Sequence, residues 1–238
     1  MIKRALMGAA AAFLLVACNP GGSPPGSATN TVGGADVVAS TQTKMTTKTK
    51  SLSLDPGKAA QAGQVAIADV ITYGGPKVTI TAPDGWQLIR DDSTPTTRQS
   101  LYWHAIQAND PSPTWSFSTP VDAQGAIVLL SNVAPGAPVD MSNAKTGSGG
   151  SLKSSTMTTT ADGDLVLIFK STDFGNSPLQ VQVPGDMSAV VAQEKSPHQY
   201  WILATYQGQN GATEETDFEF PQLVNWVAAQ VAIKHGTH

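Results

Sequence analysis

The sequence is poor in cysteine, in charge and in aromatic residues. Cys18 is the only cysteine among 238 residues, so a domain that follows it can contain no disulfide and must be stabilised by a hydrophobic core. Charged residues make up 13% of the chain, about half of the usual ~25%. This low charge, together with abundant Ser, Thr, Gly, Asn and Gln, favours an extracellular β-protein over a cytosolic helical protein.

The charges that remain are mostly acidic. The chain has 14 basic and 18 acidic residues, and its formal net charge is −4. Loss of residues 1–18 with a signal peptide would remove Lys3 and Arg4 and lower the net charge to −6. Because an acidic surface repels phosphate backbones, we expect no nucleic-acid partner.

Motifs for common cofactors are absent. The chain has no P-loop, no dinucleotide fingerprint and no Gly-x-Ser-x-Gly nucleophile elbow. Its four histidines do not have metal-ligand spacing, and the acidic groups at 91–92 and 162–164 do not follow an EF-hand pattern. The sequence therefore predicts neither a cofactor nor a metal site.

The first eighteen residues have the features of a secretory signal. Two basic residues precede an apolar run at 5–14, and small residues lead to Cys18. The apolar run is shorter than the ~20 residues that a membrane span needs. The start of the chain therefore predicts export rather than a transmembrane helix.

The four residues Leu-Val-Ala-Cys at 15–18 resemble a bacterial lipobox. This resemblance implies cleavage before Cys18, lipidation of that residue, and attachment of the protein to a membrane of the cell envelope through the lipid. Asn19 resembles the residue that permits sorting to the outer membrane in a Gram-negative host. An ordinary signal peptide, in which Cys18 has no role, is the alternative.

Residues 19–50 begin with a stretch rich in Pro, Gly and Ser and continue with Thr and Lys. They contain few large apolar residues, so burial cannot offset the entropy lost by ordering the segment. The sequence predicts a disordered tether here, followed by a folded domain over residues 51–238.

From residue 51 the chain consists of β-branched and aromatic runs divided by turn residues, which is typical of an all-β, antiparallel β-sandwich. The alanine-rich segment 222–234 is predicted as a strand, because its apolar residues alternate. A Gly-Ser loop is expected at 147–151 and a hairpin turn at Asp162-Gly163, and no fixed-period repeat is visible. Strands are expected within 65–71, 78–80, 86–88, 98–108, 115–117, 126–130, 155–160, 165–169, 200–206 and 224–233.

Several short motifs resemble those of secreted bacterial β-sandwich domains. The resemblance covers most of residues 51–238 and implies a jelly-roll of the lectin and glucanase kind, but it assigns no catalytic or binding residue. The motifs lie at 82–86, 100–105, 115–118, 125–128, 138–140, 158–165 and 226–228.

An acidic segment near the end of the chain is the strongest catalytic candidate. In a strand, Glu215, Asp217 and Glu219 would project from one face, because side chains alternate with a period of two. Retaining glycosidases need two carboxyl groups about 5–5.5 Å apart, one of them protonated. The Glu-x-Asp-x-Glu pattern resembles the active-site strand of glycoside hydrolase family sixteen, which implies Glu215 as nucleophile, Asp217 as helper and Glu219 as acid/base. Fewer strands follow the pattern here than in that family, and an acidic segment without catalytic role is the alternative.

Aromatic residues concentrate on the expected strands. In Tyr102-Trp103 and Tyr200-Trp201 adjacent side chains face opposite sides, so one ring of each pair is expected to point outward or towards the other layer. An exposed ring could stack on a sugar. Trp103 and Trp201 are the candidates, and burial in a core is the alternative for each.

The function predicted first is a lipid-anchored, non-enzymatic binding or adhesion module whose partner is a glycan or a surface protein. The alternatives are a secreted retaining glycoside hydrolase that uses Glu215 and Glu219, and a purely structural component of the envelope.

Overall fold

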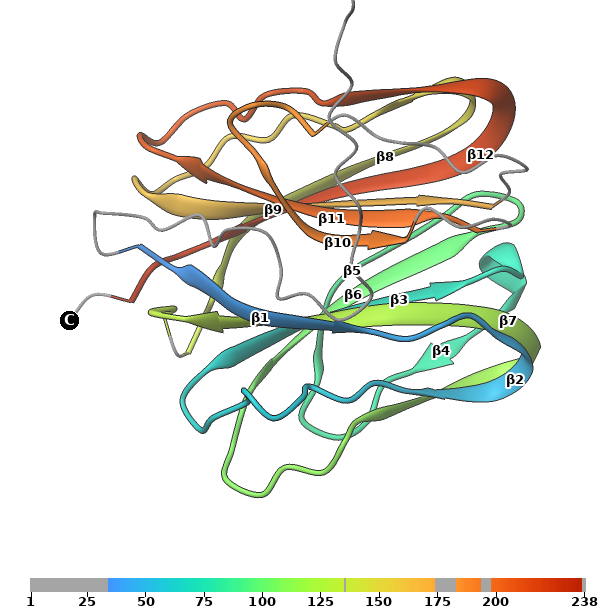
Figure 1. The fold of residues 1–238 in the computed structure, drawn as a ribbon, viewed down its shortest axis with the longest axis horizontal. Coiled ribbons are helices and arrows are strands. Elements are labelled where there is room, and N and C mark those ends of the chain that lie inside the picture. The colour runs from blue at the N-terminus through green and yellow to red at the C-terminus, as the bar shows by residue number, and fades with distance from the viewer. Residues whose placement is uncertain (1–33, 135, 174–182, 194–197, 237–238) are drawn as a thin grey trace, which may run out of the picture.

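The computed structural model of the protein describes residues 34–134, 136–173, 183–193 and 198–236. Cys18, the expected signal and the first part of the expected tether lie outside these residues. The described chain is all-β, with two antiparallel sheets lying one above the other (Figure 1) and helical structure only in the short 3₁₀ turn Gly75–Lys77. No helix in this part of the chain is long and apolar enough to cross a membrane.

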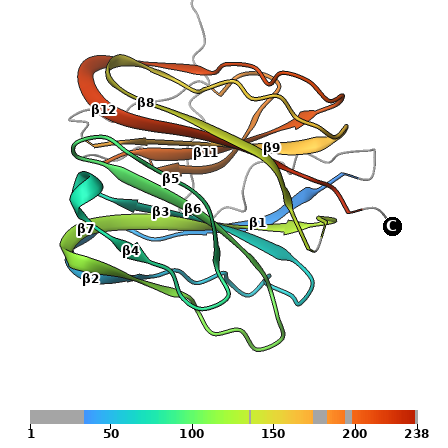
Figure 2. The ribbon, with the colours of Figure 1, turned by 180° about the vertical axis from the view of Figure 1, so that it is seen from behind.

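The first sheet is built from the N-terminal half of the described chain. Its strand order is β1-β7-β3-β6-β5, and both β2 and β4 pair with the first part of β7. Because β7 is long and continues beyond its neighbours β1 and β3, the sheet curls into a half-barrel (Figure 2). The strands are β1 (Asp36–Gln42), β2 (Thr46–Ser53), β3 (Val65–Thr72), β4 (Ile80–Thr81), β5 (Gln87–Ser93), β6 (Arg98–Ala105) and β7 (Thr114–Ser131).

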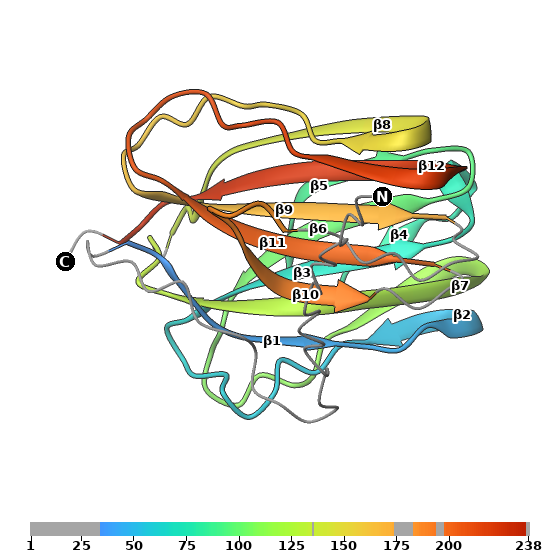
Figure 3. The same cartoon turned by 45° about the horizontal axis from the view of Figure 1, so that its top comes forward.

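The second sheet is built from the C-terminal half. Its strand order is β10-β11-β9-β12-β8, and Figure 3 shows these strands side by side in this order. The two longest strands of this sheet, β8 and β12, pair with each other along nearly their whole length. The strands are β8 (Val139–Lys153), β9 (Asp164–Thr172), β10 (Ser188–Gln193), β11 (Tyr200–Gln207) and β12 (Asp217–Ile233).

Strands β1 and β2 correct the expected tether over residues 19–50. β1 and most of β2 lie inside that segment, and β1 pairs with β7 from Asp36 opposite Ser131 to Gln42 opposite Ala126. Most side chains of β2 are exposed, so a strand at this place needs few large apolar residues. Threonine and valine also favour extended strands. Two strands at the start of the described chain were therefore not predicted, because their residues include few large apolar side chains.

The Gly-Ser loop expected at 147–151 is part of β8 instead. Gly147 lies opposite Trp226 in the neighbouring strand, and a Cβ atom at Gly147 would approach the indole ring to 2.4 Å. Glycine is present here because the Trp226 ring lies over the strand, and not because the chain turns.

The segment that follows β8 also differs from the expectation. Residues 155–160, expected as a strand, contribute only the isolated bridge between Thr158 and Ala212. Gly163 does turn the chain, with a φ of 73°. The strand after it, β9, pairs with β11 and β12 rather than with the preceding segment, so the turn is not a hairpin.

The central strands β3 and β9 are buried on both faces, and three hydrophobic cores follow from this. Side chains such as Ile67 and Leu167 point between the sheets and form the first core. Neighbouring side chains such as Ala68 and Ile168 point away from the other sheet, into a second and a third core that the curled ends of the sheets cover. The expected strands at 65–71, 165–169, 200–206 and 224–233 are confirmed, whereas 115–117 and 126–130 belong to the single strand β7.

The two halves of the chain have the same topology. We name Asp36–Ser131 the first lobe and Val139–Ile233 the second lobe. In each lobe the first strand lies beside the last, the last beside the central strand, and the central strand beside a hairpin, which gives β1-β7-β3-β6-β5 and β8-β12-β9-β11-β10. β8 takes the place of β1 and β2 together, because all three pair with the last strand of their lobe.

Two irregularities of the strands recur at equivalent places in both lobes. The hairpin of the first lobe shifts register between Leu88 and Arg90, and that of the second shifts between Ala189 and Val191. The last strand skips from Ser116 to Val121 in one lobe and from Glu219 to Val224 in the other. When the two lobes are aligned by the pairing of their strands, each residue of the first lobe corresponds to a residue of the second lobe about 100 positions later. The sequence shows no repeat, but the structure contains one.

The lobes pack back to back in a reciprocal way. β1 contacts β10 and β5 contacts β8, and Ser40 donates a hydrogen bond to the carbonyl of Val190 (2.9 Å) across the first of these contacts. β1 is equivalent to β8 and β5 to β10. Exchanging the two lobes therefore turns the β1–β10 contact into the β8–β5 contact, as in an isologous dimer.

Candidate functional site

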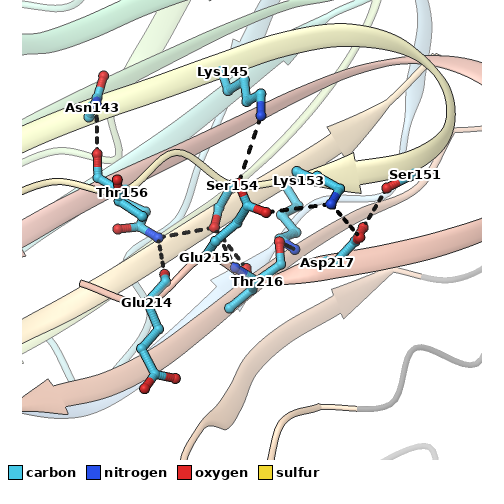
Figure 4. A network of polar contacts seen from close by, with 12 residues as sticks. Asn143, Lys145, Ser151, Lys153, Ser154, Thr156, Glu214, Glu215, Thr216 and Asp217 are labelled. Carbon is cyan, nitrogen blue, oxygen red and sulfur yellow. Dashed lines mark hydrogen bonds and ion pairs between the residues drawn. The ribbon is translucent and has the colours of Figure 1, made fainter. Parts of the chain in front are cut away.

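The acidic segment lies at the start of β12 (Figure 4). Thr216 and Phe218 are buried, whereas Glu215, Asp217 and Glu219 are exposed. The predicted alternation of the side chains is therefore present. Strand β12 begins only at Asp217, so Glu215 belongs to the preceding irregular segment.

Two lysines of β8 neutralise the first two carboxylates. Glu215 lies 3.8 Å from Lys145 and 3.6 Å from Lys153, and Asp217 lies 3.3 Å from Lys153. Partial burial raises the pKa of Asp217, but hydrogen bonds from Ser151 and Lys153 outweigh it and hold the pKa below its usual value. Asp217 is thus ionised at neutral pH. The resemblance gives the acid/base role to Glu219, whose side chain is exposed, whereas the acid of such an enzyme lies in an apolar pocket.

The aromatic candidates are less accessible than expected. Trp201 is 1% exposed and meets Phe218 edge-on, with ring centroids 5.6 Å apart. Tyr200 is also buried, so neither ring of this pair faces solvent. Trp103 is half-buried and packs against the core between the sheets. A ring that stacks on a sugar needs a solvated face, whereas both faces of β11 are covered at this pair.

A third tryptophan lines a pocket at one end of the first lobe. We name it the Trp86 pocket; it encloses about 400 Å³, open solvent at its mouth included. It is formed by the turn before β5, the end of β6 and the loop that leads to β7. Its lining residues are Pro56, Pro83, Asp84, Trp86, His104, Ile106, Asp110, Pro111 and Pro113.

Neighbouring rings hold Trp86 in place. Its indole stacks on the His104 ring, with centroids 5.2 Å apart and planes 23° apart, and it meets Trp115 edge-on at 5.0 Å. Gly85 has a φ of 82°, and a Cβ atom there would lie 3.1 Å from the His104 ring. Glycine therefore allows both the turn and the close approach of the histidine. The Pro-Asp-Gly turn was visible in the sequence, but the exposure of Trp86 depends on rings from distant strands.

His104 is held at both ring nitrogens. Nδ1 bonds to the carbonyl of Gly85 at 3.0 Å and Nε2 to the carboxylate of Asp110 at 2.8 Å. The backbone N–H of Gln107 and, to a smaller degree, His104 lower the pKa of Asp110. These two contacts of His104 fix the orientation of the ring on which Trp86 stacks.

Among the residues that the structure describes, no three His, Cys, Asp or Glu side chains are grouped so that they could hold a metal ion.

A scan against protein-family models found no match for this chain, and searches of curated proteins and of solved structures found none either.

Proposed function

We propose that the protein is a non-enzymatic binding module, held at the bacterial cell envelope by a lipid on Cys18, and that it recognises a glycan through the Trp86 pocket. The observation that carries this proposal is the partly exposed Trp86 ring, fixed between His104 and Trp115 at the mouth of a pocket. In a Gram-negative host, Asn19 favours the outer membrane as the location.

The chemistry of the lining supports a sugar. The indole and four prolines offer rigid apolar surfaces against which the C–H faces of a sugar ring can pack. Asp84 is exposed at the rim, where its carboxylate can accept hydrogen bonds from hydroxyl groups. No lysine or arginine is among the lining residues, so an anionic ligand gains nothing here.

The lysine pairs around Glu215 and Asp217 favour this proposal over a retaining glycoside hydrolase. The likeness to lectin and glucanase jelly-rolls remains a prediction. Two stacked antiparallel sheets agree with it, whereas each sheet here comes from one continuous half of the chain, without the Greek-key crossings of a jelly-roll. The glycan proposal therefore rests on the pocket and not on that likeness.

A glycan panel tests the proposal. The unlipidated Cys18→Ser chain should leave the membrane fraction and bind at least one neutral glycan. Trp86→Ala should weaken this binding about tenfold or more, because aromatic anchors carry much of the energy of such contacts. Glu215→Gln with Glu219→Gln serves as the matched control and should leave binding unchanged. Binding that survives Trp86→Ala, or release of reducing ends that Glu215→Gln abolishes, would contradict the proposal.

A further inference from the structure

The second lobe has its own pocket at the place equivalent to the Trp86 pocket. We name it the Gln230 pocket; it encloses about 590 Å³, open solvent included. Its lining residues are Val166, Ile168, Asp186, Met187, Thr205, Tyr206, Gln207, Ala212, Thr213, Glu214 and Gln230.

The same local structure forms both mouths. The backbone N–H of Met187 bonds to the carbonyl of Pro184 at 3.0 Å, as that of Trp86 bonds to Pro83 at 3.3 Å. Thr205 donates to the carbonyl of Asp186 at 3.1 Å, which repeats the bond between His104 and Gly85. The two pockets are therefore equivalent in position, but the ring stack of the first has no counterpart in Met187 and Thr205.

Polar side chains replace apolar ones inside the second lobe. Gln230 pairs with Ile168 in the neighbouring strand, and the equivalent residue Ile127 pairs with Ala68. The backbone N–H of Ser154 bonds to the carbonyl of Thr216, and that of the equivalent Leu54 bonds to Pro113. The equivalent pairs are Leu54 and Ser154, Val70 and Lys170, Pro113 and Thr216, and Ile127 and Gln230.

These polar groups form one hydrogen-bonded network. Thr213 donates to Gln230 Oε1 at 2.6 Å, and Gln230 Nε2 donates to Ser154 Oγ at 3.1 Å. Thr216 donates to the same Ser154 oxygen at 3.0 Å, and Lys170 Nζ donates to the Thr216 carbonyl at 3.1 Å. Gln230, Ser154 and Lys170 are completely buried. The first lobe forms without any of these groups, so the fold does not require them.

We propose that the Gln230 pocket is a second ligand site, and that it takes a neutral polyhydroxylated molecule. Burying polar groups costs free energy even when they are paired, and departures from the simplest packing are expected where a protein functions. The network continues to the pocket wall, because Thr213 and Gln230 line it and are 6% and 0% exposed.

The lining selects the class of ligand. Gln230 is completely buried and acts through Thr213, whose hydroxyl it holds at the pocket wall by the 2.6 Å bond. The partly exposed Thr205 and Gln207 offer a hydroxyl and an amide group to a ligand. Glu214 and Asp186 are exposed at the mouth and add carboxylate acceptors. No lysine or arginine is among the lining residues, which disfavours anions. Hydroxyl groups, which both donate and accept, match this set of groups best.

Titration of the Cys18→Ser chain with glucose, and separately with glycerol, tests the site by NMR. The backbone amides of Thr205, Thr213 and Glu214 should shift on addition of glucose. Gln230→Ile should abolish these shifts, while the matched control Ile127→Val and the Trp86→Ala variant should retain them. Because this readout does not depend on Trp86, failure of the first glycan site leaves the second site testable.

A second variant guards against misfolding. Glu214 is exposed, so Glu214→Gln cannot disturb the core, and it should weaken glucose binding about threefold through one weakened hydrogen bond. Shifts that persist in Gln230→Ile, shifts that Trp86→Ala removes, or no shift in the Cys18→Ser chain at up to about 50 mM of either compound would overturn the second site.

Discussion

The first lobe has apolar residues at Leu54, Val70, Pro113 and Ile127, whereas the second lobe has a buried polar network at the equivalent positions. Both lobes nevertheless keep the same strand order, the same register shifts and the same turn before the hairpin. The architecture therefore depends on central strands buried on both faces and on the placement of bulges and turns. The identity of the interior residues can change, provided that polar residues are introduced as a set whose members bond to one another.

The two lobes also differ in the residues that they contribute to the core between the sheets. Asp69 in β3 is completely buried and points into the core between the sheets, where Gln99 donates to both of its oxygens at 3.0 Å. The equivalent residue of β9 is Phe169, which belongs to that core. The core between the sheets thus has a buried carboxyl group in the first lobe where the second lobe has a phenyl ring, and the pH dependence of stability can report on it.

The largest effect is expected when a single polar residue of the second lobe is placed in the first. Leu54→Ser should lower the free energy of unfolding by about 4 kcal/mol, because burial is lost and the new hydroxyl faces Pro113 and Ile127 instead of the partners of Ser154. Urea denaturation measures this change. Leu54→Ala is the control, since it removes the same contacts without a hydroxyl. Equal losses for the two variants would show that a buried hydroxyl at this position costs nothing even without the partners that Ser154 has.

The next effect concerns the buried lysine. Lys170 Nζ lies 3.6 Å from the centre of the Phe218 ring, and burial lowers the pKa of Lys170 from 10.5 to about 7, against the opposing influence of Asp217 and Glu215. Between these two pH values the unfolded chain binds a proton that the folded chain lacks, so stability rises with pH across this window. Lys170→Val, which installs the residue of the first lobe, should remove a rise of roughly 3 kcal/mol.

Chemical denaturation at pH 6, 8 and 10 measures this rise. The control is Lys58→Val at an exposed position, which should keep the pH dependence of the original chain. A rise that persists in Lys170→Val would assign the dependence to another group.

The third effect has the opposite sign. Burial raises the pKa of Asp69 from 3.8 to about 7, although the hydrogen bonds from Gln99 lower it in part. Between these values the folded chain holds a proton that the unfolded chain has lost, so stability falls as pH rises from about 4 to 7. Asp69→Asn should abolish this fall and leave the variant roughly 2 kcal/mol more stable than the original at pH 7.5. Thermal unfolding across this range measures it, with the exposed Asp84→Asn as control; an unchanged slope in Asp69→Asn would show that the carboxyl is ionised in the folded state.

Sequence patterns predicted the elements whose burial follows a simple period. The alternation of Val227, Ala229 and Val231 correctly predicted a strand despite the alanines. The same rule misplaced Trp201, because alternation reveals two faces but not that a curled sheet covers both. The repeat was invisible because equivalent residues such as Val65 and Leu165 share polarity rather than identity.

Prediction of the site was limited by contacts between distant strands. The turn before Trp86 could be read from local residues. The rings of His104 and Trp115 that hold it, and the partners of Gln230, come from strands far away in the sequence. Glycine was misread for a related reason, since Gly147 lies in a strand only because Trp226 covers it.

The smallest effect is expected where the lobes differ on their exposed surface. Lys153 and Asp217 face each other across β8 and β12 at 3.3 Å, and the equivalent pair, Ser53 and Thr114, joins two hydroxyl groups at 2.8 Å. An exposed ion pair gains little, because solvent screens the charges and ordering two long side chains costs entropy. The double variant Lys153→Ser with Asp217→Thr, which installs the hydroxyl pair in the second lobe, should therefore change the thermal unfolding midpoint by less than about 1 °C. Scanning calorimetry at low and at high salt checks this. A large, salt-dependent loss would show that the acidic segment of β12 holds the curled end of the second lobe closed, and its charges would then be structural rather than incidental.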